Sequence, residues 1–541
     1  MLTRITPRII ALALTMAAQP PAHHGALARA VAAPATLAAR IDAILSRAAF
    51  KHAMFGIEFY SLDANKPLYT LNADKLFVPG STTKLVTMGS ALQLLGPDYR
   101  FHTRVYRTGT IDADGTLRGD LVLVASGDTN LSGRIRPGDT LAFENVDHTY
   151  GGAESHGLEG DPLRVIRELA ASVAAGGVKR IDGRVIVDAS LFPEGQPEGG
   201  TGFILSPVVV NDNAIDISIA PGASEGAAAV ARISPATSYA RFNNRAVTGK
   251  AGSRDDVRIS SDATNGDGTH TVTISGSVAA DSTGTLSGYR VPQPSRFAEI
   301  VFAEALHERG IAAAARAAED HVDAAALSAA CTADRVIAEH VSPPFAEEVK
   351  VTLKVSHNLH ASATPFLLGA LIGSADHRGG AAEGFARIKT FLETTGADVT
   401  GASQSDGAGA EAHFTPDFMV HYLAYMAKQP TASIFHDALP ILGKDGTLWN
   451  IQVRSPAAGH VYAKTGTFST RDLLNNGVMV TGKGLAGYMT TMDGEHVAFA
   501  IYANNVALRD GNLVTPLVGE ALGEIAAAAY DAKHDRRAKS N

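Results

Sequence analysis

Two regions near the ends of the chain carry the apolar and aromatic runs that are typical of β-strands. Residues 52–60 form one run, a polar turn follows at 63–66, and a second short run covers 68–70. Short apolar runs bounded by turn residues favour strands, so we expect a hairpin here. The later runs are 461–464, 485–491 and 497–502, with a turn at Asp493-Gly494. We expect further strands at these positions.

Apolar residues recur at helical spacing in the segment 81–95, which follows Pro79-Gly80 and precedes Gly96-Pro97. The recurring residues are Leu85, Met88, Leu92 and Leu95. Such a repeat between a start and a stop signal predicts a helix that begins at Ser81. Another helical region is expected after Ser342-Pro343-Pro344, and a closing helix over 520–530.

The region 105–340 has a different character, with short β-like runs separated by glycine and aspartate turns. Its clearest strand-like runs are 121–124 and 185–187, and its clearest helical patterns are 162–176 and 297–310. Residues 206–290 are the richest in strands and turns, so we expect a nested β module there. Strands at both ends of the chain indicate that its terminal segments share one sheet, with 105–340 inserted between them.

Composition limits the classes of protein that this chain can belong to. Its 541 residues, 45% of them hydrophobic, exceed the size of a single core, so two or three domains are expected. The net charge of -8 creates no basic field for nucleic acid or anionic lipid. Cys331 is the only cysteine, which excludes an internal disulfide and a multi-cysteine metal site.

The first 30 residues have the pattern of a secretory signal peptide. Arg4 and Arg8 precede an apolar run at 9–18, and small-residue cleavage sites follow at 26–30. About ten apolar residues are too few to span a bilayer. We expect a periplasmic or otherwise exported protein without a transmembrane anchor, because no later segment is long and apolar enough to span. The basic end, 531–541, is expected to be a solvated tail.

Three short motifs carry candidate chemistry. They are Ser81-x-x-Lys84, Ser356-His357-Asn358 and Lys464-Thr465-Gly466, and each pattern occurs once. This order is that of β-lactamases and penicillin-binding proteins. Each motif alone also has a structural interpretation: a helix cap for Ser81, a loop that caps itself for Ser356-Asn358, and a guarded hairpin edge for Lys464.

The residue types explain the spacing of the first motif. Three residues along a helix place Ser81 and Lys84 on one face, where the amine can accept the hydroxyl proton. A lysine of ordinary pKa is charged at pH 7, and neutralising it costs about 4 to 5 kcal/mol. Burial and a second cation lower that cost, and Lys464 is the expected cation.

The other motifs offer groups that relay protons and bind substrate. The Ser356 hydroxyl and the Asn358 amide are expected in one loop, aimed into the same cleft. Lys464, Thr465 and Thr467 offer a cation and two hydroxyls to a free carboxylate. Gly466 is expected to leave room for substrate along that strand.

These motifs and their spacing resemble the low-molecular-mass class C penicillin-binding proteins, which are serine-type D-Ala-D-Ala carboxypeptidases and endopeptidases and include the type-4 penicillin-binding proteins. Ser356 lies 275 positions after Ser81, and Lys464 lies 108 positions after Ser356, as in members with two extra domains. Other stretches agree, namely Gly119-Asp120-Leu121, Gly127-Asp128, Asn211-Asp212-Asn213, Asp406-Gly407-x-Gly409 and Asp445-Gly446-Thr447-Leu448.

The resemblance implies an α+β fold in which an antiparallel sheet flanked by helices is interrupted by two smaller, mostly β domains, one nested in the other. The implied parts are 36–104 with 340–530, 105–205 with 291–339, and the nested 206–290. It also implies that Ser81 is acylated, that Lys84 is its base, that Ser356 and Asn358 relay a proton and hold substrate, and that Lys464, Thr465, Gly466 and Thr467 form the carboxylate-binding strand. The backbone N–H groups of Ser81 and Thr467 would form the oxyanion hole.

The implied activity is hydrolysis of peptidoglycan stem peptides through an acyl-Ser81 ester, with β-lactams as covalent inhibitors. No cofactor or metal is expected, because protein groups supply the chemistry and His357, His360, His413 and His460 are scattered. The chain departs from the family at 356–362, where Ser-Asp-Asn-Leu-Tyr-Ala-Glu has become Ser-His-Asn-Leu-His-Ala-Ser, and at 408–411. A β-lactamase or esterase on the same scaffold, or a wall-binding protein without turnover, are the alternatives.

Overall fold

The computed structural model describes residues 36–317, 320, 324–374 and 379–532. The expected signal peptide, and residues 533–541 of the expected tail, lie outside these residues. The boundaries expected between domains stay predictions.

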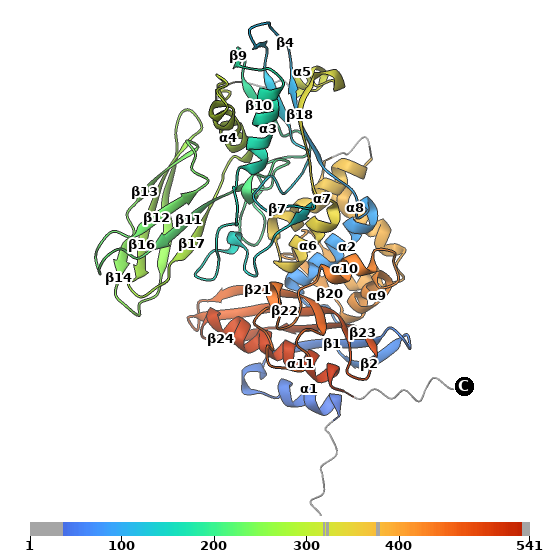
Figure 1. Cartoon of the computed structure of the whole chain (residues 1–541). Coiled ribbons are helices and arrows are strands. Elements are labelled where there is room, and N and C mark those ends of the chain that lie inside the picture. The colour runs from blue at the N-terminus through green and yellow to red at the C-terminus, as the bar shows by residue number, and fades with distance from the viewer. Residues whose placement is uncertain (1–35, 318–319, 321–323, 375–378, 533–541) are drawn as a thin grey trace, which may run out of the picture. The chain divides into compact units, whose positions relative to one another are not determined.

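One antiparallel sheet joins the two ends of the chain (Figure 1). Its strands lie in the order β2 (Lys66–Leu71), β1 (Met54–Ser61), β23 (His496–Asn504), β22 (Gly477–Thr490) and β21 (Val461–Asp472), and β24 (Val506–Leu508) also pairs with β22. The N-terminal hairpin pairs with the C-terminal strands through β1 and β23, from Met54 opposite Asn504 to Ser61 opposite Val497. The strand β21, which carries the third motif, lies at the edge of this path.

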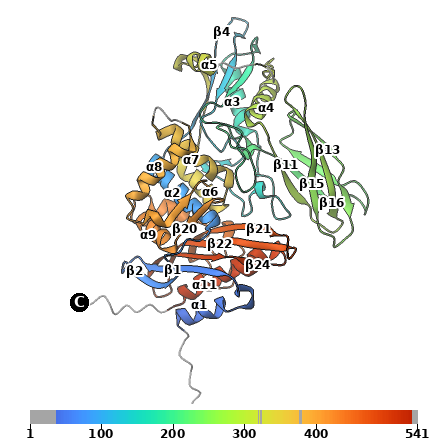
Figure 2. The ribbon, with the colours of Figure 1, turned by 180° about the vertical axis from the view of Figure 1, so that it is seen from behind.

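Helices cover both faces of this sheet (Figures 1 and 2). On one face lie α1 (Leu37–Leu45) and α11 (Glu520–Tyr530), and on the other lie α2 (Thr83–Leu95), α6 (Phe345–Lys354), α7 (Asn358–Ile372), α8 (Ala381–Glu393), α9 (Pro416–Met426) and α10 (Ala432–Asp437). Successive side chains of β23 point to opposite faces of the sheet, so the strand contributes to a core on each face. Phe499 and Ile501 pack in the core of α1 and α11, and Ala500 packs in the core of α2 and α9. The short hairpin β19 (Ala402–Gln404) and β20 (Ala412–Phe414) follows α8.

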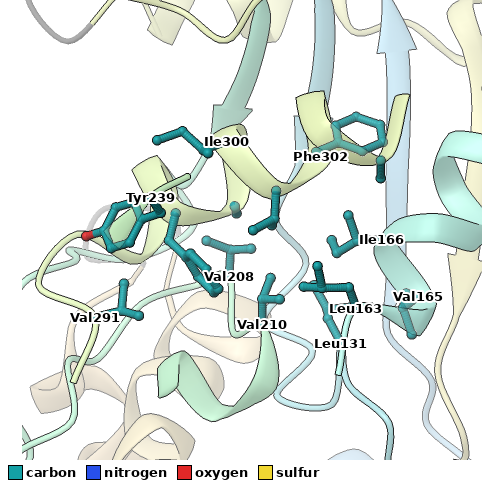
Figure 3. Close-up of a cluster of buried hydrophobic side chains, with 14 of the residues drawn as sticks. Leu131, Leu163, Val165, Ile166, Val208, Val210, Tyr239, Val291, Ile300 and Phe302 are labelled. Carbon is teal, nitrogen blue, oxygen red and sulfur yellow. The ribbon is translucent and has the colours of Figure 1, made fainter. Parts of the chain in front are cut away.

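The middle of the chain forms smaller sheets. The order β10 (Val185–Asp188), β6 (Leu121–Val124), β3 (His102–Arg107) and β18 (Val336–Val341) defines one of them, with α3 (Arg164–Ala175), α4 (Pro294–Glu308) and α5 (Ala324–Ala330) in the same region. Short pairings add β4 (Thr110–Ile111), β5 (Thr116–Arg118), β9 (Arg180–Ile181), β7 (Ile135–Arg136) and β8 (Thr140–Leu141). Figure 3 shows the core of this region, where Ile300 and Phe302 of α4 belong to the same buried cluster as Leu163 and Ile166.

The strands between Ala214 and Arg290 form two further sheets. The first is β12 (Val230–Ser234), β11 (Ala214–Ala220) and β17 (Thr285–Arg290). The second is β13 (Ala240–Asn244), β16 (His270–Ala279) and β14 (Val247–Gly249), with β15 (Asp256–Thr264) beside β16. In β11, Ile215, Ile217 and Ile219 recur at every second position, and all three are buried.

One expectation about membrane spans needs correction. The segment Gly511–Tyr530 is long and apolar enough to cross a membrane by length and composition. In the structure 61% of that apolar window is buried, and Leu522 and Ile525 pack in the core beneath the central sheet. Its apolar residues therefore serve as a core helix in this fold.

Candidate active site

Ser81 lies at the junction of a glycine-containing turn and a buried helix. Gly80 has φ of +53°, a conformation that residues with a Cβ adopt rarely, and the 3₁₀ turn Gly80–Thr82 leads directly into α2. Residues Thr83 to Leu92 are all buried, so the helix that carries Ser81 is held firmly by the core. Ser81 itself is partly exposed and lines a cavity.

Lys84 brings the first and second motifs together. Its side chain is fully buried, and Nζ lies 2.7 Å from Ser81 Oγ, 2.7 Å from Asn358 Oδ1 and 3.4 Å from Ser356 Oγ. The carbonyl of Ala408 lies 3.3 Å from the same nitrogen. When it is neutral, a lysine held in this position can take the proton of the Ser81 hydroxyl.

Burial lowers the pKa of Lys84 to about 7, although Glu198 and Asp406 act in the opposite direction. At neutral pH a large fraction of the amine is therefore unprotonated, and the cost of neutralising an ordinary lysine has largely been met by the fold. Lys464 had been expected to supply this effect as a neighbouring cation. The expected burial is the largest cause of this shift, and Lys464 is not among its causes, although the charge of Lys84 lowers the pKa of Lys464.

The second motif lies at the start of a helix. Ser356 has φ of +63°, and Asn358 is the first residue of α7. The Tyr150 hydroxyl donates to the Ser356 carbonyl over 2.5 Å. The expected loop is thus a strained turn and a helix N-terminus, held from outside by a residue of the insertion.

The third motif lies in the middle of β21, which continues to Asp472. The strand expected over 461–464 therefore extends well beyond the third motif. Lys464 is fully buried and donates to the carbonyl of Thr465 over 2.8 Å. Burial and the charges of Lys84 and Lys483 lower the pKa of Lys464 well below its usual value. The Thr465 hydroxyl donates to Thr447 Oγ1 over 2.7 Å.

Lys483 is a further cation at this position. It lies opposite Thr467 in the pairing of β21 with β22 and donates to Thr467 Oγ1 over 2.6 Å. Burial lowers the pKa of Lys483 to about 8. At pH 7 most of this side chain is therefore protonated.

Glycines allow β21 to approach the turn before Ser81. A Cβ at Gly466 would lie 2.0 Å from Pro79 O and 3.0 Å from Ser81 N, and a Cβ at Gly80 would lie 2.5 Å from Thr467 N. The two glycines thus bring the backbone nitrogens of Ser81 and Thr467 to adjoining positions. The room at Gly466 had been expected to receive substrate, but the structure fills it with the turn before Ser81.

A cavity of about 300 Å³ opens on these groups. It is lined by residues of all three motifs, of the insertion and of the C-terminal segments, among them Ser81, Asn145, Tyr150, Glu154, Ser356, Asn358, Thr447, Trp449, Thr465, Thr467 and Lys483. This arrangement is suited to acyl transfer. The Ser81 hydroxyl lies beside the partly neutral amine of Lys84, the backbone N–H groups of Ser81 and Thr467 adjoin each other, and Lys483 supplies a cation.

A family model described as the D-Ala-D-Ala carboxypeptidase 3 (S13) family matches residues 37–522. The chain belongs to this family. The resemblance found in the sequence motifs is thereby confirmed, and with it the assignment to the serine-type D-Ala-D-Ala carboxypeptidases.

The S13 chain is similar to two described relatives over most of its length. It is 29% identical over 487 residues to the D-alanyl-D-alanine carboxypeptidase of Actinomadura sp. strain R39, covering 86% of this chain and 80% of the relative. The crystal structure of penicillin-binding protein 4 from Haemophilus influenzae matches with a TM-score of 0.66 and 19% identity, over 91% of this chain and 98% of that one. The same protein complexed with a novel β-lactam gives a TM-score of 0.63 at 18% identity, over 92% and 100%. These structures confirm the expected α+β fold class.

The structure also explains part of the second altered stretch of this S13 chain. Asp406 accepts from the backbone N–H groups of Ala408 and Gly409, over 2.6 Å each. A Cβ at Gly407 would lie 1.8 Å from Ala361 O, so this turn packs directly on α7. The resulting turn presents the Ala408 carbonyl to Lys84, a function that the side chain at 408 does not affect.

Sequence reasoning missed several residues that line the site. Asn145, Tyr150 and Glu154 come from the insertion, and Lys483 comes from a strand that had been identified only for its apolar residues. One signal for Lys483 was present, a lysine between two glycines in an otherwise apolar run. Its pairing with Thr467 depends on strand register, which no local pattern determines.

The histidines are less scattered than expected. Within the residues that the structure describes, side-chain atoms of Asp212, His357 and His360 that could bind a metal lie within 4.8 Å of one another, and those of Asp147, His148 and Asp212 do the same. The rings of His357 and His360 stack with centroids 3.7 Å apart. Both groups are buried directly behind the second motif.

Proposed function

We propose that this S13 peptidase hydrolyses the D-Ala-D-Ala bond of peptidoglycan stem peptides with Ser81 as its nucleophile. The observation that carries the proposal is the position of Lys84 Nζ, which is buried and lies 2.7 Å from both Ser81 Oγ and Asn358 Oδ1. The neutral amine accepts the Ser81 proton as Oγ attacks the carbonyl carbon of the penultimate residue. A tetrahedral intermediate forms, and its oxyanion lies against the N–H groups of Ser81 and Thr467.

Collapse of the intermediate breaks the peptide bond and leaves an acyl-Ser81 ester. The leaving D-alanine nitrogen receives a proton from Lys84, relayed through the Ser356 hydroxyl, and Asn358 holds the substrate's peptide group. Water then cleaves the ester and restores the serine. Cleavage of a peptide cross-link would use the same atoms, so endopeptidase action belongs to the same proposal.

The terminal carboxylate of the substrate binds at β21. Thr465 and Thr467 supply hydroxyls, and Gly466 keeps the strand close to Ser81. We assign the positive charge at this point to Lys483 together with Lys464, because Lys483 lines the cavity and contacts the Thr467 hydroxyl. Because β21 is an edge strand, a peptide can lie along it as an added strand.

The two alternatives gain no particular support. A β-lactamase needs a base for the hydrolytic water, and the oxygens of the buried Glu198 accept from the backbone of Gly200 and Gly202 instead. A wall-binding protein without turnover was suggested by the altered second motif, yet Ser356 and Asn358 still contact Lys84.

We also propose that the protein is exported to the periplasm or its equivalent, where peptidoglycan lies.

Intact-protein mass spectrometry after treatment with benzylpenicillin tests this function. We expect one stable adduct on the wild-type chain and none on Ser81→Ala, together with loss of D-alanine release from an acyl-D-Ala-D-Ala peptide. Ser90→Ala, which changes a buried serine of the same helix, is the matched control and should keep the adduct. Rapid loss of the adduct would instead support a β-lactamase, and D-alanine release by Ser81→Ala would contradict the mechanism.

A further inference from the structure

The three residues of the second motif face two different sides. Ser356 and Asn358 contact Lys84, as described above, whereas His357 between them contacts the insertion. The His357 ring is 1% exposed, with Nε2 3.4 Å from Asp212 Oδ1 and 3.5 Å from Asp147 Oδ1. Its Nδ1 accepts from the backbone N–H of His360 over 3.4 Å, as a cap of α7. A neutral ring that accepts at Nδ1 carries its proton at Nε2. That nitrogen lies within ion-pair distance of both carboxylates, although it completes a hydrogen bond of good geometry with neither.

His357 is one member of a buried group that we call the histidine–carboxylate cluster. Its members are Arg134, Asp147, His148, Asp212, His357 and His360, with Asp216 and Glu348 at its edges. The insertion supplies the five members that precede residue 340. Of the others, Glu348 lies in α6, His357 caps α7 and His360 lies in α7. The cluster therefore joins the insertion to the helix that carries the catalytic asparagine.

Ion pairs link every part of this cluster. Arg134 Nη2 donates to Asp147 over 2.6 Å and to Asp212 over 2.7 Å. His148 donates from Nε2 to Asp212 and from Nδ1 to Asp216, over 2.7 and 2.8 Å. These charged partners are almost entirely without solvent exposure, so removing one of them leaves an unpaired buried charge.

His360 forms the second link to the catalytic helix. Its Nε2 lies 2.7 Å from Asp212 Oδ1, and its Nδ1 lies 3.1 Å from Glu348 Oε1. Although burial acts in the opposite direction, these carboxylates raise the pKa of His360 to about 9. Burial and the neighbouring His360 lower the pKa of His357. The cluster thus holds charged His148 and His360 beside a neutral His357.

Backbone strain marks the two segments that the cluster joins. Asn211, Asp212 and Asn213 have φ of 48°, 57° and 53°, and Ser356 has φ of 63°. Non-glycine residues keep such conformations only where surrounding contacts determine them, and such strain is often found at functional sites. Here the contacts are the cluster on one side of Ser356 and the Tyr150 hydroxyl on its carbonyl.

We propose that the histidine–carboxylate cluster is a positioning unit for the reaction at Ser81, in which Asp147 and Asp212 of the insertion hold Ser356 and Asn358 against Lys84 through the neutral ring of His357. This rests on the function proposed above. The insertion is therefore part of the catalytic machinery in this chain, although its cluster residues touch no reacting atom. An aspartate at 357, the residue usual in this motif, would place a third carboxylate beside Asp147 and Asp212.

A divalent metal is the competing interpretation of the same residues. Arg134 already donates to both carboxylates that would bind it, and Nδ1 of His357 is used by the helix cap, which leaves Nε2 protonated. Protons on His148 and His360 supply the positive charge that an ion would bring. The groups around His357 therefore fit protons and an arginine better than a metal.

Three variants test the proposal in the full chain. His357→Asp adds a like charge, His357→Gln keeps a neutral donor, and Asp212→Asn removes the acceptor. We expect His357→Asp and Asp212→Asn to slow acylation by a fluorescent penicillin on the order of 10²-fold, because small displacements of catalytic groups have effects of this size. His357→Gln should stay within about 10-fold of wild type, and KM for D-alanine release should change much less than kcat in all three.

Glu299→Gln is the control, since it removes another buried carboxylate whose partners, Arg296 and Arg316, lie in the insertion. It should lower stability without slowing acylation. The proposal would be overturned if His357→Asp were acylated at the wild-type rate with an unchanged melting temperature. It would also be overturned if His357→Gln were acylated as slowly as His357→Asp. Stoichiometric zinc in the purified protein, with acylation lost to a chelator, would also overturn it in favour of a metal site. Failure of the proposed function would differ, because wild type itself would then form no Ser81 adduct.

Discussion

At the scale of single residues, the site depends on where the fold places three lysines. Lys84, Lys464 and Lys483 are all buried, and the pKa of each is lowered by burial. Only Lys84 contacts the Ser81 hydroxyl, and only Lys483 contacts the hydroxyl of Thr467. The same physical effect thus prepares one amine to accept a proton and leaves another as the cation next to the carboxylate-binding threonines.

The pKa of Lys84 predicts how acylation depends on pH. The protonated amine cannot accept the Ser81 proton, so the acylation rate constant should rise with pH and level off above about 7. Below this value it should fall about tenfold per pH unit. A C-terminal ester substrate without a free carboxylate isolates this effect in stopped-flow measurements between pH 5 and 9. A flat profile, or a midpoint near that of free lysine, would exclude Lys84 as the base.

Lys483 predicts a specificity for substrates with a free carboxylate. We expect Lys483→Met to lower kcat/KM for an acyl-D-Ala-D-Ala acid by about 10- to 100-fold, since a hydrogen bond to a charged group contributes about 1.5 to 3 kcal/mol. The corresponding amide should be affected little. Because burial lowers the pKa of Lys483 to about 8, the wild-type KM for the acid should also rise above that pH. Lys389→Met, on an exposed lysine, is the control; equal losses with acid and amide would refute the assignment.

At the scale of elements, the site is a junction of a strand and two helix starts. The edge strand β21 lies against the turn before α2, and α7 begins beside Lys84. A residue of positive φ precedes each helix start, Gly80 before α2 and Ser356 before α7. Close backbone approach at this junction aligns the two N–H groups that the proposed mechanism assigns to the oxyanion.

Gly466→Ala tests the importance of that approach. Its Cβ would lie 2.0 Å from Pro79 O, a backbone atom, so β21 must move away from Ser81. We expect acylation to fall by about 10²- to 10³-fold, the usual effect of losing one oxyanion donor. Gly380→Ala is the matched control, because that glycine has φ of -95° and open space where a Cβ would lie. Near-normal acylation by Gly466→Ala would show that the strand can shift without harming the site.

At the scale of the whole molecule, the buried charges of the insertion contribute to stability as well as to the site. The pKa of His360 is about 9 in the fold, against 6.5 for an ordinary histidine. Because the pKa of His360 is raised in the fold, its protonated ring stabilises the folded state. This stabilisation is fully present below pH 6.5 and is lost as the pH rises through about 9.

Comparison of wild type with His360→Gln isolates this contribution, because both proteins share every other titrating group. The difference in the free energy of unfolding should be largest at pH 6.5 and should shrink by pH 9, by an amount on the order of 3 kcal/mol. Urea unfolding at pH 6.5, 8 and 9 measures it. A difference that stays constant, or grows with pH, would show that His360 is neutral in the fold.

The sequence by itself determined the local elements and the three motifs. Helical spacing predicted α2 from Ser81 onward, turn residues predicted the hairpin of β1 and β2, and the closing helix was expected at the bounds that α11 has. These features depend on neighbours in the chain, and periodicity and turn chemistry are local signals. The order and spacing of the motifs also sufficed for the family, which the match over 37–522 confirms.

Only the tertiary structure decided which groups meet. Lys483 reaches Thr467 through strand register, Tyr150 reaches Ser356 across 206 residues, and Asp212 reaches His360 across 148. Burial, which sets the pKa of Lys84, is likewise a property of the packed core. The physical reason is the same in each case: contacts between distant segments and their desolvation depend on the whole packing, which no window of the sequence contains.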